Sequence, residues 1–374
     1  LHPPTRLPRM DGPPIYRLPQ DALYHIFSAL PLRQIIVCRS VCKLFHQILT
    51  SRCFIDEVSA GKPPLRLLAL RPSHHHRRHV SPHPSLHAFD PDADQWFRFP
   101  LTFLPFGSPH PVASSAGLVY FWADSPDSVK SLIACNPLTG HYRVLPQLGS
   151  AWWRHGSVLV DSSNRVLVLT QLATLYFSGS DSWLTFSSNL PSKPRSPVLV
   201  SQSIYALCDV GSPWRSQWKL FSCTLMGLRK PPPWNCMERH EWGDVFDILK
   251  RPRLVRGLEN QILMVGGLKS SFSLNALCST IVILKLDLES LEWDEASRMP
   301  LEMYRCFQES SKFKVFGAGS QVCFSAKRIG KLALWDCSAQ PGKGEWRWID
   351  GLRGNGDVFY RGFVFEACLP ALPR

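Results

Sequence analysis

Residues 18–45 read LPQDALYHIFSALPLRQIIVCRSVCKLF, and this stretch sets the beginning of the chain apart from the rest. Apolar side chains recur in it three and four residues apart, at Leu23, Ile26, Phe27 and Leu30. This spacing places them on one face of an amphipathic helix. The stretch therefore predicts helical structure, with the prolines of its two Leu-Pro pairs at helix boundaries.

Two further short helices are expected in the same stretch, at residues 32–37 and 40–49. With the first helix they form a domain at residues 16–60, which follows a flexible segment rich in Pro and Arg at residues 1–15. Three short helices bury little apolar surface on their own, so a unit of this size is only marginally stable without a partner. The sequence therefore predicts a docking module.

From residue 63 onward the chain consists of short runs rich in Val, Leu, Ile, Phe and Trp, separated by Gly, Ser, Asn, Asp and Pro. Such runs are typical of β-strands joined by turns. Many of them pair across tight polar turns, at residues 114–117, 162–165, 201–203, 257–260 and 317–320. The hairpins group into six units with a period of roughly 40–60 residues, which indicates propeller blades and not a single β-sandwich.

The two ends of this region each hold an incomplete unit. The first unit has strands expected at residues 65–70, 86–90 and 96–99 but lacks an opening strand, whereas the last offers a single strand at 362–369. Joined together they make one complete blade, which closes the ring and protects its edge strands. The sequence thus predicts a mainly β protein in which a small N-terminal helical module precedes a six-bladed β-propeller at residues 63–370.

The helical stretch resembles an F-box. In that family one Leu-Pro pair precedes the first helix, a second follows it, and a Val-Cys-Lys sequence lies in the third helix; Phe45 stands here where Trp is commoner. The resemblance implies a three-helix fold that binds a Skp-family adaptor, which in turn bridges to a cullin scaffold. The residues implied to contact the adaptor are Leu18, Pro19, Leu30, Pro31, Val41, Cys42 and Lys43.

A plainer interpretation of these adaptor residues is that their apolar side chains only form the small helical core. To that core we assign four residues, Leu23, Ile26, Phe45 and Ile48.

The strand-rich part resembles the kelch type of propeller. Its clearest unit has a hydrophobic strand that ends in Gly-Gly at residues 262–267, followed by Asp287, Trp293 and Met299-Pro300. The other units lack the double glycine, so the repeat is a degenerate one. The turns Phe-Asp-Pro and Cys-Asn-Pro-Leu-Thr-Gly resemble those of plant F-box proteins, among them the unusual floral organs group.

Together the two resemblances imply the substrate-recognition subunit of an SCF-type (Skp–cullin–F-box) E3 ubiquitin ligase, working in the nucleus or the cytoplasm. In this role the propeller binds a target protein that the sequence does not identify, and the chain itself is not an enzyme. The alternative is an F-box/propeller co-regulator that assists a DNA-bound transcription factor, its basic loops contacting nucleic acid. The net charge of +13 does not decide between them, because the Lys and Arg residues are scattered and do not alternate with aromatic residues.

A target is expected to bind the propeller face that carries the longer loops. If the strands of a blade are named a to d from the axis outward, the b–c and d–a connections share one face and are long. They carry Trp and Arg, which are common anchors of protein interfaces. The candidates are Trp152, Trp153, Arg154, Trp214, Arg215, Trp234, Arg239 and Trp242. The stretch at residues 229–253 is the strongest candidate, and the alternative is a set of mobile, solvated loops.

Metal, redox and membrane functions find little support. None of the 12 cysteines lies in a C-x-x-C pair, so buried free thiols are expected, not a zinc ribbon or a disulfide framework. The His-rich stretch at residues 74–87 contains Arg77 and Arg78, which oppose a metal ion, so it is expected to be a solvated loop. Without a catalytic motif we expect no metal and no cofactor. No apolar run approaches the ~18 residues that a membrane-spanning helix needs.

Overall fold

The chain folds as two compact units. In the computed structural model, one unit is formed by Leu1–Leu65 with Cys368–Pro370 and the other by Arg66–Ala367 with Ala371–Arg374. The residues that the structure describes are 15, 18–58, 61–71, 84–124, 130–149, 152, 155–179, 181–271, 277–308, 312–339, 344–352 and 359–373. Most of the predicted flexible segment at 1–15 and most of the His-rich stretch at 74–87 lie outside them.

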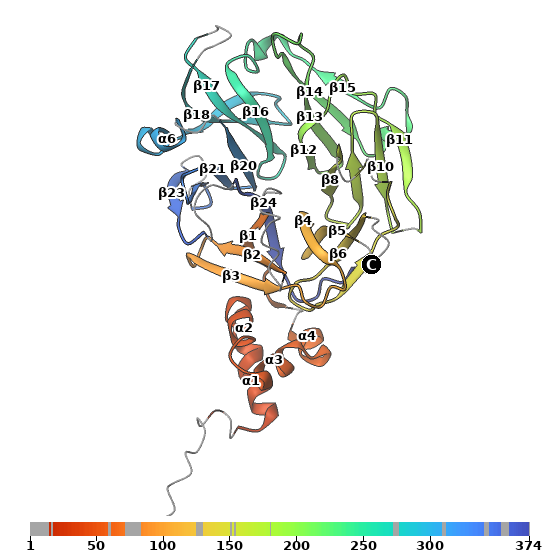
Figure 1. The fold of residues 1–374 in the computed structure, drawn as a ribbon, viewed down its shortest axis with the longest axis vertical. Helices are drawn as coiled ribbons and strands as arrows, with labels where there is room; N and C mark the ends of the chain where they lie inside the picture. Colours follow the sequence, from red (N-terminus) through yellow and green to blue (C-terminus); the bar gives the residue numbers. More distant parts are fainter. Residues whose placement is uncertain are drawn as a thin grey trace, which may run out of the picture. The chain divides into compact units, whose positions relative to one another are not determined.

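Four helices make up the first unit (Figure 1). They are α1 (Gln20–Ala29), α2 (Leu32–Cys38), α3 (Lys43–Thr50) and α4 (Arg52–Val58). Pro19 and Pro31 immediately precede α1 and α2, where the N–H that proline lacks has no helical partner. Cys42 caps α3, because its Sγ accepts a hydrogen bond of 3.4 Å from the main-chain N–H of Phe45. The predicted helix boundaries at the two Leu-Pro pairs are therefore confirmed.

The core of the helical unit differs from the expectation at one position. Leu23, Phe45 and Ile48 are buried as expected, but Ile26 is 43% exposed. At 100° per residue, Ile26 stands about 60° from Leu23 on the side away from Phe27, which is at the edge of the apolar stripe. Because the helical unit is small, it buries only the residues in the middle of this apolar stripe. A fourth helix that the pattern did not indicate, α4, completes the core with buried residues Phe54, Ile55 and Val58.

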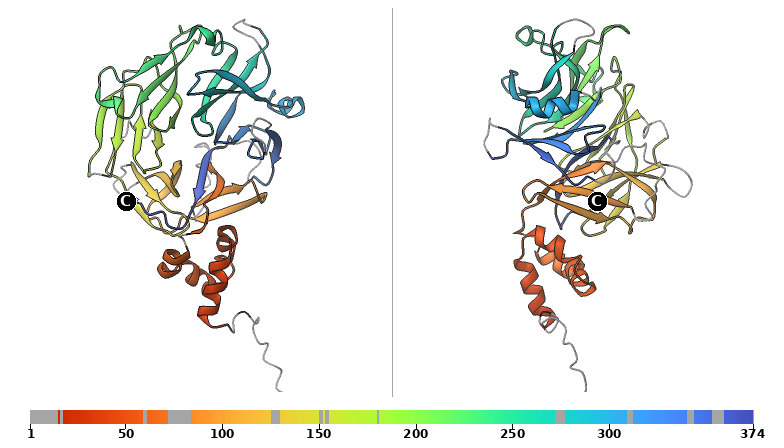
Figure 2. Two further views of the ribbon diagram at one scale, coloured as in Figure 1. Left: turned by 180° about the vertical axis from the view of Figure 1, so that it is seen from behind. Right: turned by 60° about the vertical axis from the view of Figure 1, so that its left-hand side comes forward.

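The second unit is a ring of six four-stranded antiparallel blades, which Figure 2 shows from two further sides. Blade 1 contains β24 (Arg361–Ala367), β1 (Leu65–Arg71), β2 (Ser85–Asp90) and β3 (Gln95–Pro100). Blade 2 contains β4 (Gly107–Ser115), β5 (Leu118–Asp124), β6 (Lys130–Cys135) and β7 (Tyr142–Val144). Blade 3 contains β8 (Ser157–Val160), β9 (Val166–Leu169), β10 (Ala173–Phe177) and β11 (Leu184–Ser187).

The other three blades repeat this order, with the first strand next to its counterparts in the neighbouring blades. Blade 4 contains β12 (Arg195–Val200), β13 (Ser203–Asp209), β14 (Trp218–Thr224) and β15 (Asn235–Met237). Blade 5 contains β16 (Leu249–Arg256), β17 (Gln261–Lys269), β18 (Cys278–Asp287) and β19 (Trp293–Arg298). Blade 6 contains β20 (Phe313–Ala318), β21 (Gln321–Ala326), β22 (Leu332–Asp336) and β23 (Glu345–Ile349). The expected six-bladed propeller is confirmed.

The ring closes as the incomplete end units predict. β24, which comes last in the chain, takes the first place in blade 1 and is hydrogen-bonded to β1. A single sheet therefore holds strands from both ends of the propeller sequence. The inner edge of β1, between blades 6 and 2, is thereby paired with β24.

The second strand of a blade explains the unbroken apolar runs in the sequence. Every residue of β9 and β21 is buried, and so is every residue of β5 except Asp124. Such a strand contacts the neighbouring blade on each of its two faces, so its apolar residues do not alternate with polar ones. The resulting clusters join consecutive blades, such as the one formed by Val166 and Val168 with Tyr120.

Polar residues at the end of the third strands close the outer hairpins. Side-chain oxygens of Asp90, Asn136 and Asp287 each accept a hydrogen bond from the N–H two residues later, at 3.0, 2.9 and 2.8 Å. This local turn is the one that Asp and Asn favour. It accounts for their constant spacing to the aromatic residue that follows six positions on.

Tryptophans of the outer strands tie adjacent blades together. Trp96 of blade 1 donates from Nε1 to the carbonyl of Asp350, which follows blade 6, at 2.8 Å. Trp346 of blade 6 donates to Oγ of Ser297 in blade 5 at 2.9 Å. Both indoles therefore bridge neighbouring blades. Among the described helices of the whole chain, none is long and apolar enough to span a bilayer.

Candidate adaptor-binding and substrate-binding surfaces

The residues predicted to contact an adaptor divide into exposed and half-buried ones. Five are exposed, namely Leu18, Pro19, Pro31, Val41 and Lys43. Leu30 and Cys42 are half-buried and also pack against the core of the helical unit. Val41 is the most open of the apolar side chains, with 57% of its surface exposed. The structure thus leaves most of the predicted set accessible, and its role in binding stays a prediction.

The helical unit also exposes large apolar side chains that the motif did not indicate. They are Ile15, Ile26, Val37 and Leu44. Together with Leu18 and Val41 they form what we call the exposed apolar set. They come from the segment before α1, from helices α1, α2 and α3, and from the turn between α2 and α3. A folded monomer normally covers such a concentration of apolar groups, so the set indicates a surface that a partner covers. The sequence indicates this surface indirectly, because the short helices contain more apolar residues than one buried face of each helix accommodates.

Hydrogen bonds fix the turn that presents the second Leu-Pro pair. Nζ of Lys62 donates to the carbonyl of Ser28 at 2.8 Å and also to the carbonyl of Leu30. These bonds satisfy carbonyl groups at the end of α1, which have no partner within the helix. The Leu30-Pro31 turn is therefore held in place without any partner protein.

A second set of bonds joins the outer helices. Oη of Tyr24 in α1 donates to a carboxylate oxygen of Glu57 at 2.7 Å and lies 2.9 Å from the carbonyl oxygen of Cys53 in α4. Burial, together with the bond to the Glu57 carboxylate, raises the pKa of Tyr24 to about 12. The phenol therefore stays protonated and keeps donating across the physiological pH range.

The substrate-binding candidates on the propeller do not share one environment. Trp153 and Arg154 lie outside the described residues. Trp152 is half-buried and packs against the cluster between blades 2 and 3. Trp214 and Arg215 are exposed, and Trp214 has 88% of its surface open. Of the described candidates, only the Trp214–Arg215 pair presents both an aromatic ring and a guanidinium to solvent.

The turn that carries Trp214 is braced. Oδ1 of Asp209, at the end of β13, accepts hydrogen bonds from the N–H groups of Gly211 and Gln217 at 3.0 and 2.9 Å. Ser212 accepts a further bond from the N–H of Arg215 at 3.1 Å. The b–c connection of blade 4 is thus a compact turn with an exposed indole at its tip, which is the geometry of a preorganised anchor.

The structure corrects the expectation that Trp234 and Trp242 are loop anchors. Only 9% and 8% of their surfaces are exposed. Trp234 fills the cluster between blades 3 and 4. Trp242 lies in the cluster between blades 4 and 5, where its Nε1 donates to the carbonyl of Leu291 at 2.7 Å and its ring lies 6.0 Å from that of Trp293. Both indoles hold neighbouring blades together and have little surface left for a target.

The stretch at residues 229–253 is also not one loop. Strand β15 divides it, so Trp234 belongs to the c–d connection of blade 4. Arg239 and Trp242 belong to the d–a connection that follows, at the other end of the strand. The prediction of a single insertion fails because a strand of three residues is too short to stand out in the sequence.

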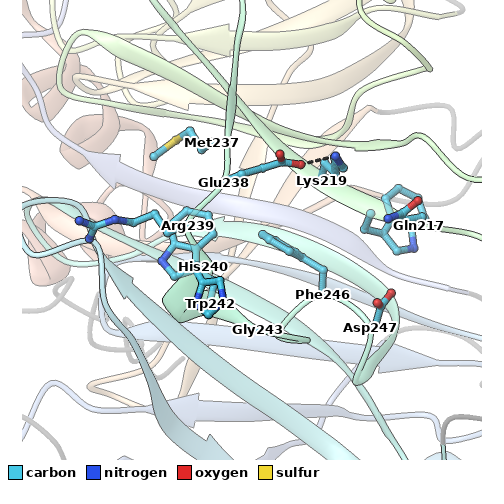
Figure 3. Close-up of a pocket in the computed structure, with 11 residues that line it drawn as sticks. Gln217, Lys219, Met237, Glu238, Arg239, His240, Trp242, Gly243, Phe246 and Asp247 are labelled. Carbon is cyan, nitrogen blue, oxygen red and sulfur yellow. Dashed lines mark ion pairs between the residues drawn. The ribbon is translucent and has the colours of Figure 1, made fainter.

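A pocket of about 440 Å³ lies between this d–a connection and the edge of blade 4 (Figure 3). Trp242 and Phe246, with ring centroids 6.0 Å apart, supply its aromatic wall. The ion pair of Lys219 with Glu238 contributes to the wall formed by blade 4. Arg239 also lines the pocket and donates to the carbonyl of Ser290 at 3.1 Å. The pocket brings together two of the predicted residues, Arg239 and Trp242.

Comparison with known proteins gives the following matches. An F-box domain model matches residues 15–57. SKP1-interacting partner 15 of Arabidopsis thaliana is 63% identical over 380 residues, which cover 97% of this chain and 100% of that protein. An F-box/kelch-repeat protein of the same plant is 24% identical over 376 residues, covering 95% of this chain and 87% of that protein. Protein UNUSUAL FLORAL ORGANS, also of Arabidopsis thaliana, is 29% identical over 159 residues, covering 37% and 34% of the two chains.

These matches confirm the resemblances that the Leu-Pro pairs, the Val-Cys-Lys sequence and the kelch-like unit indicated. The similarity to the floral protein covers about a third of each chain, so that protein is a distant relative. A relative with 63% identity along its whole length, and another named for both parts of the fold, agree with a helical unit followed by a propeller. The chain therefore belongs to the family of F-box/kelch-repeat proteins.

Proposed function

We propose that this protein is the substrate-recognition subunit of an SCF-type E3 ubiquitin ligase. The helical unit binds a Skp-family adaptor that leads to a cullin scaffold, and the propeller binds the target. The observation that carries the proposal is the exposed apolar set, which lies within the stretch that matches the F-box domain model. Support comes from the relative named as a SKP1-interacting partner, which is 63% identical to this chain.

The two units suit two different tasks. The helical unit exposes apolar side chains such as Val41 and Leu44, so burying them against another protein gains free energy at roughly 25 cal/mol per Å². The propeller has a different kind of surface, with a braced turn at Trp214 and a pocket beside it. A rigid ring with functional loops is a platform for recognising a protein segment.

In this proposal the chain contributes binding and no catalytic group. Ubiquitin transfer belongs to other members of the complex, to which the propeller delivers its target. In the part of the chain that the structure describes, no three His, Cys, Asp or Glu side chains gather as metal ligands would. We place the protein in the nucleus or the cytoplasm, where such ligases meet their targets.

The experiment is co-purification of an affinity-tagged chain with a Skp-family adaptor. We expect Val41→Asp combined with Leu44→Asp to weaken adaptor binding at least about hundredfold, because each substitution buries an unpaired carboxylate in an apolar contact. Leu172→Asp is the control, since Leu172 is an exposed leucine on the propeller, at 70%, compared with 38% for Leu44. Wild-type recovery of adaptor by the double variant, with unchanged circular dichroism, would refute the proposal.

A further inference from the structure

A second pocket, of about 560 Å³, opens where the first strands of blades 4, 5 and 6 begin. Its most prominent feature is positive charge. The basic side chains that line it are Arg195, Lys250, Arg251, Arg253, Lys312 and Lys314. No aspartate or glutamate is found among the described residues of the lining. Such a set, drawn from three blades, forms only when the ring is assembled.

The backbone is distorted at the point where these side chains enter the pocket. β12 shifts its register after Arg195, and β16 does so before Arg253. Within these shifts Ser196 has φ of 46° and Arg251 has φ of 56°. Left-handed conformations of residues other than glycine cost backbone energy, and they occur at binding sites as well as in turns. A β-bulge re-aims side chains, so both bulges serve to direct arginines of adjacent blades into one pocket.

The charges repel one another. Burial, and after it the charges of Arg195, Arg361 and Arg251, lowers the pKa of Arg253 to about 10. Burial, together with the charges of Arg361 and Arg253, likewise lowers the pKa of Lys314 to about 8. In the described residues no carboxylate forms an ion pair with either side chain. The pocket therefore holds cations at a cost in stability, and an anion would relieve that cost.

Apolar side chains line much of the rest of the pocket. Tyr304 and Phe307 of helix α6 (Leu301–Gln308) line it together with Leu277 and Ile281. Oη of Tyr304 donates to the carbonyl of Cys278 at 2.6 Å, which fixes the ring in place. The pocket thus combines cationic hydrogen-bond donors with apolar side chains, one of which is held in place by a hydrogen bond.

We propose that this pocket binds the phosphate group of a phosphorylated side chain in the target protein, while its apolar side chains contact a neighbouring apolar residue of the same segment. Arginine forks match phosphate oxygens, and clusters of arginine are a recurring means of reading phosphorylated motifs. The inference rests on the proposed function, because it makes the pocket part of target recognition. A mixed lining of this kind fits a peptide better than a free phosphate, which has no use for Tyr304 and Phe307.

The test uses the full chain co-purified with a Skp-family adaptor. Fluorescence anisotropy is measured with degenerate peptides that contain phosphoserine or phosphothreonine, with their unphosphorylated versions, and with myo-inositol hexakisphosphate as a competitor. We expect the phosphorylated peptides to bind at least about tenfold tighter than the unphosphorylated ones, as charge-assisted hydrogen bonds require. Arg253→Gln with Lys314→Gln should weaken that binding about tenfold to hundredfold.

Stability separates a binding role from a structural one. Removing two repelling, partly buried charges should leave the melting temperature of the double variant equal to or above that of the wild type, whereas a structural role predicts a lower value. Arg98→Gln with Lys285→Gln is the control, because it removes the same charge from outer strands of blades 1 and 5 and should leave peptide binding unchanged. Arg251→Asn, which suits the left-handed conformation and is exposed, tests the pocket without altering a buried group.

Equal binding of phosphorylated and unphosphorylated peptides would overturn the inference. So would tight binding of the inositol phosphate alone, which would assign the pocket to a soluble polyphosphate. Adaptor recovered in the same preparations reports on the proposed function separately. If the adaptor is recovered but the phosphorylated peptides bind no better than the unphosphorylated ones, the pocket assignment is rejected and the ligase role is left intact.

Discussion

Replacing Trp214 and Trp242 by alanine, one at a time, separates an exposed contact from a buried one on the same face of the propeller. Trp214 is 88% exposed, and its turn is held by main-chain bonds to Asp209, so Trp214→Ala should change the free energy of unfolding by no more than about 0.5 kcal/mol. Trp242 is 8% exposed, and truncating a core tryptophan costs about 3–5 kcal/mol. Over a propeller of about 300 residues, that loss corresponds to roughly 5–8 °C in Tm.

For target capture we expect the opposite order, with the larger loss of binding in the Trp214→Ala variant. If Trp214 is an anchor, its truncation should cost about 2 kcal/mol of binding free energy or more, which is about 30-fold in affinity. The assay compares proteins enriched by each tagged variant in the presence of a proteasome inhibitor, with differential scanning fluorimetry on the same samples. Recovery of the Skp-family adaptor is the internal control, since neither tryptophan lies in the helical unit.

Two outcomes would refute this reasoning. A Trp242→Ala variant that melts like the wild type would show that the bond to Leu291 and the packing on Trp293 do not hold blades 4 and 5 together. Undiminished capture by a stable Trp214→Ala variant would show that the braced turn is not part of the target surface.

Deleting residues 361–374 removes β24 and should cause aggregation in size-exclusion chromatography, because blade 1 then exposes an edge; a monomer with unchanged melting would contradict ring closure. Gly267→Ala should lower the free energy of unfolding by about 1–3 kcal/mol, since its new β-carbon would lie 2.6 Å from Sγ of Cys278, whereas Gly107→Ala meets nothing within 4 Å and serves as the control in urea denaturation. Phosphopeptide affinity should fall as the pH rises through about 8, the pKa of Lys314, because the free pocket then loses a cation; calorimetry in two buffers should show proton uptake on binding.

Much of the propeller could be predicted from the sequence because its second strands are buried on both faces. The runs at residues 118–123 and Val166–Leu169 are apolar throughout, and each follows a turn marked by Gly or Asn. Ring closure could also be predicted, since two incomplete units at the ends make one blade. These features depend on neighbours in the sequence or on a simple count of units.

The parts that could not be predicted depend on contacts between blades. A tryptophan in a connection, such as Trp242, looks the same in the sequence whether it faces solvent or fills the gap between two blades. The exposure of Ile26 depends on how many helices surround α1, and the spacing of apolar residues within α1 gives no information about that number. Arg195, Arg253 and Lys314 belong to three different blades, so only the closed ring reveals the pocket.

The late position of β24 has a consequence for protein synthesis. The helical unit precedes the propeller and has its own core, so it is able to fold while the ribosome is still at work. Blade 1 has to wait for a strand that emerges after every other blade. A message cut short by premature termination would therefore yield a chain with a complete F-box and an open propeller. Such a product would occupy adaptors without delivering targets, and the mutation would act as a dominant-negative allele.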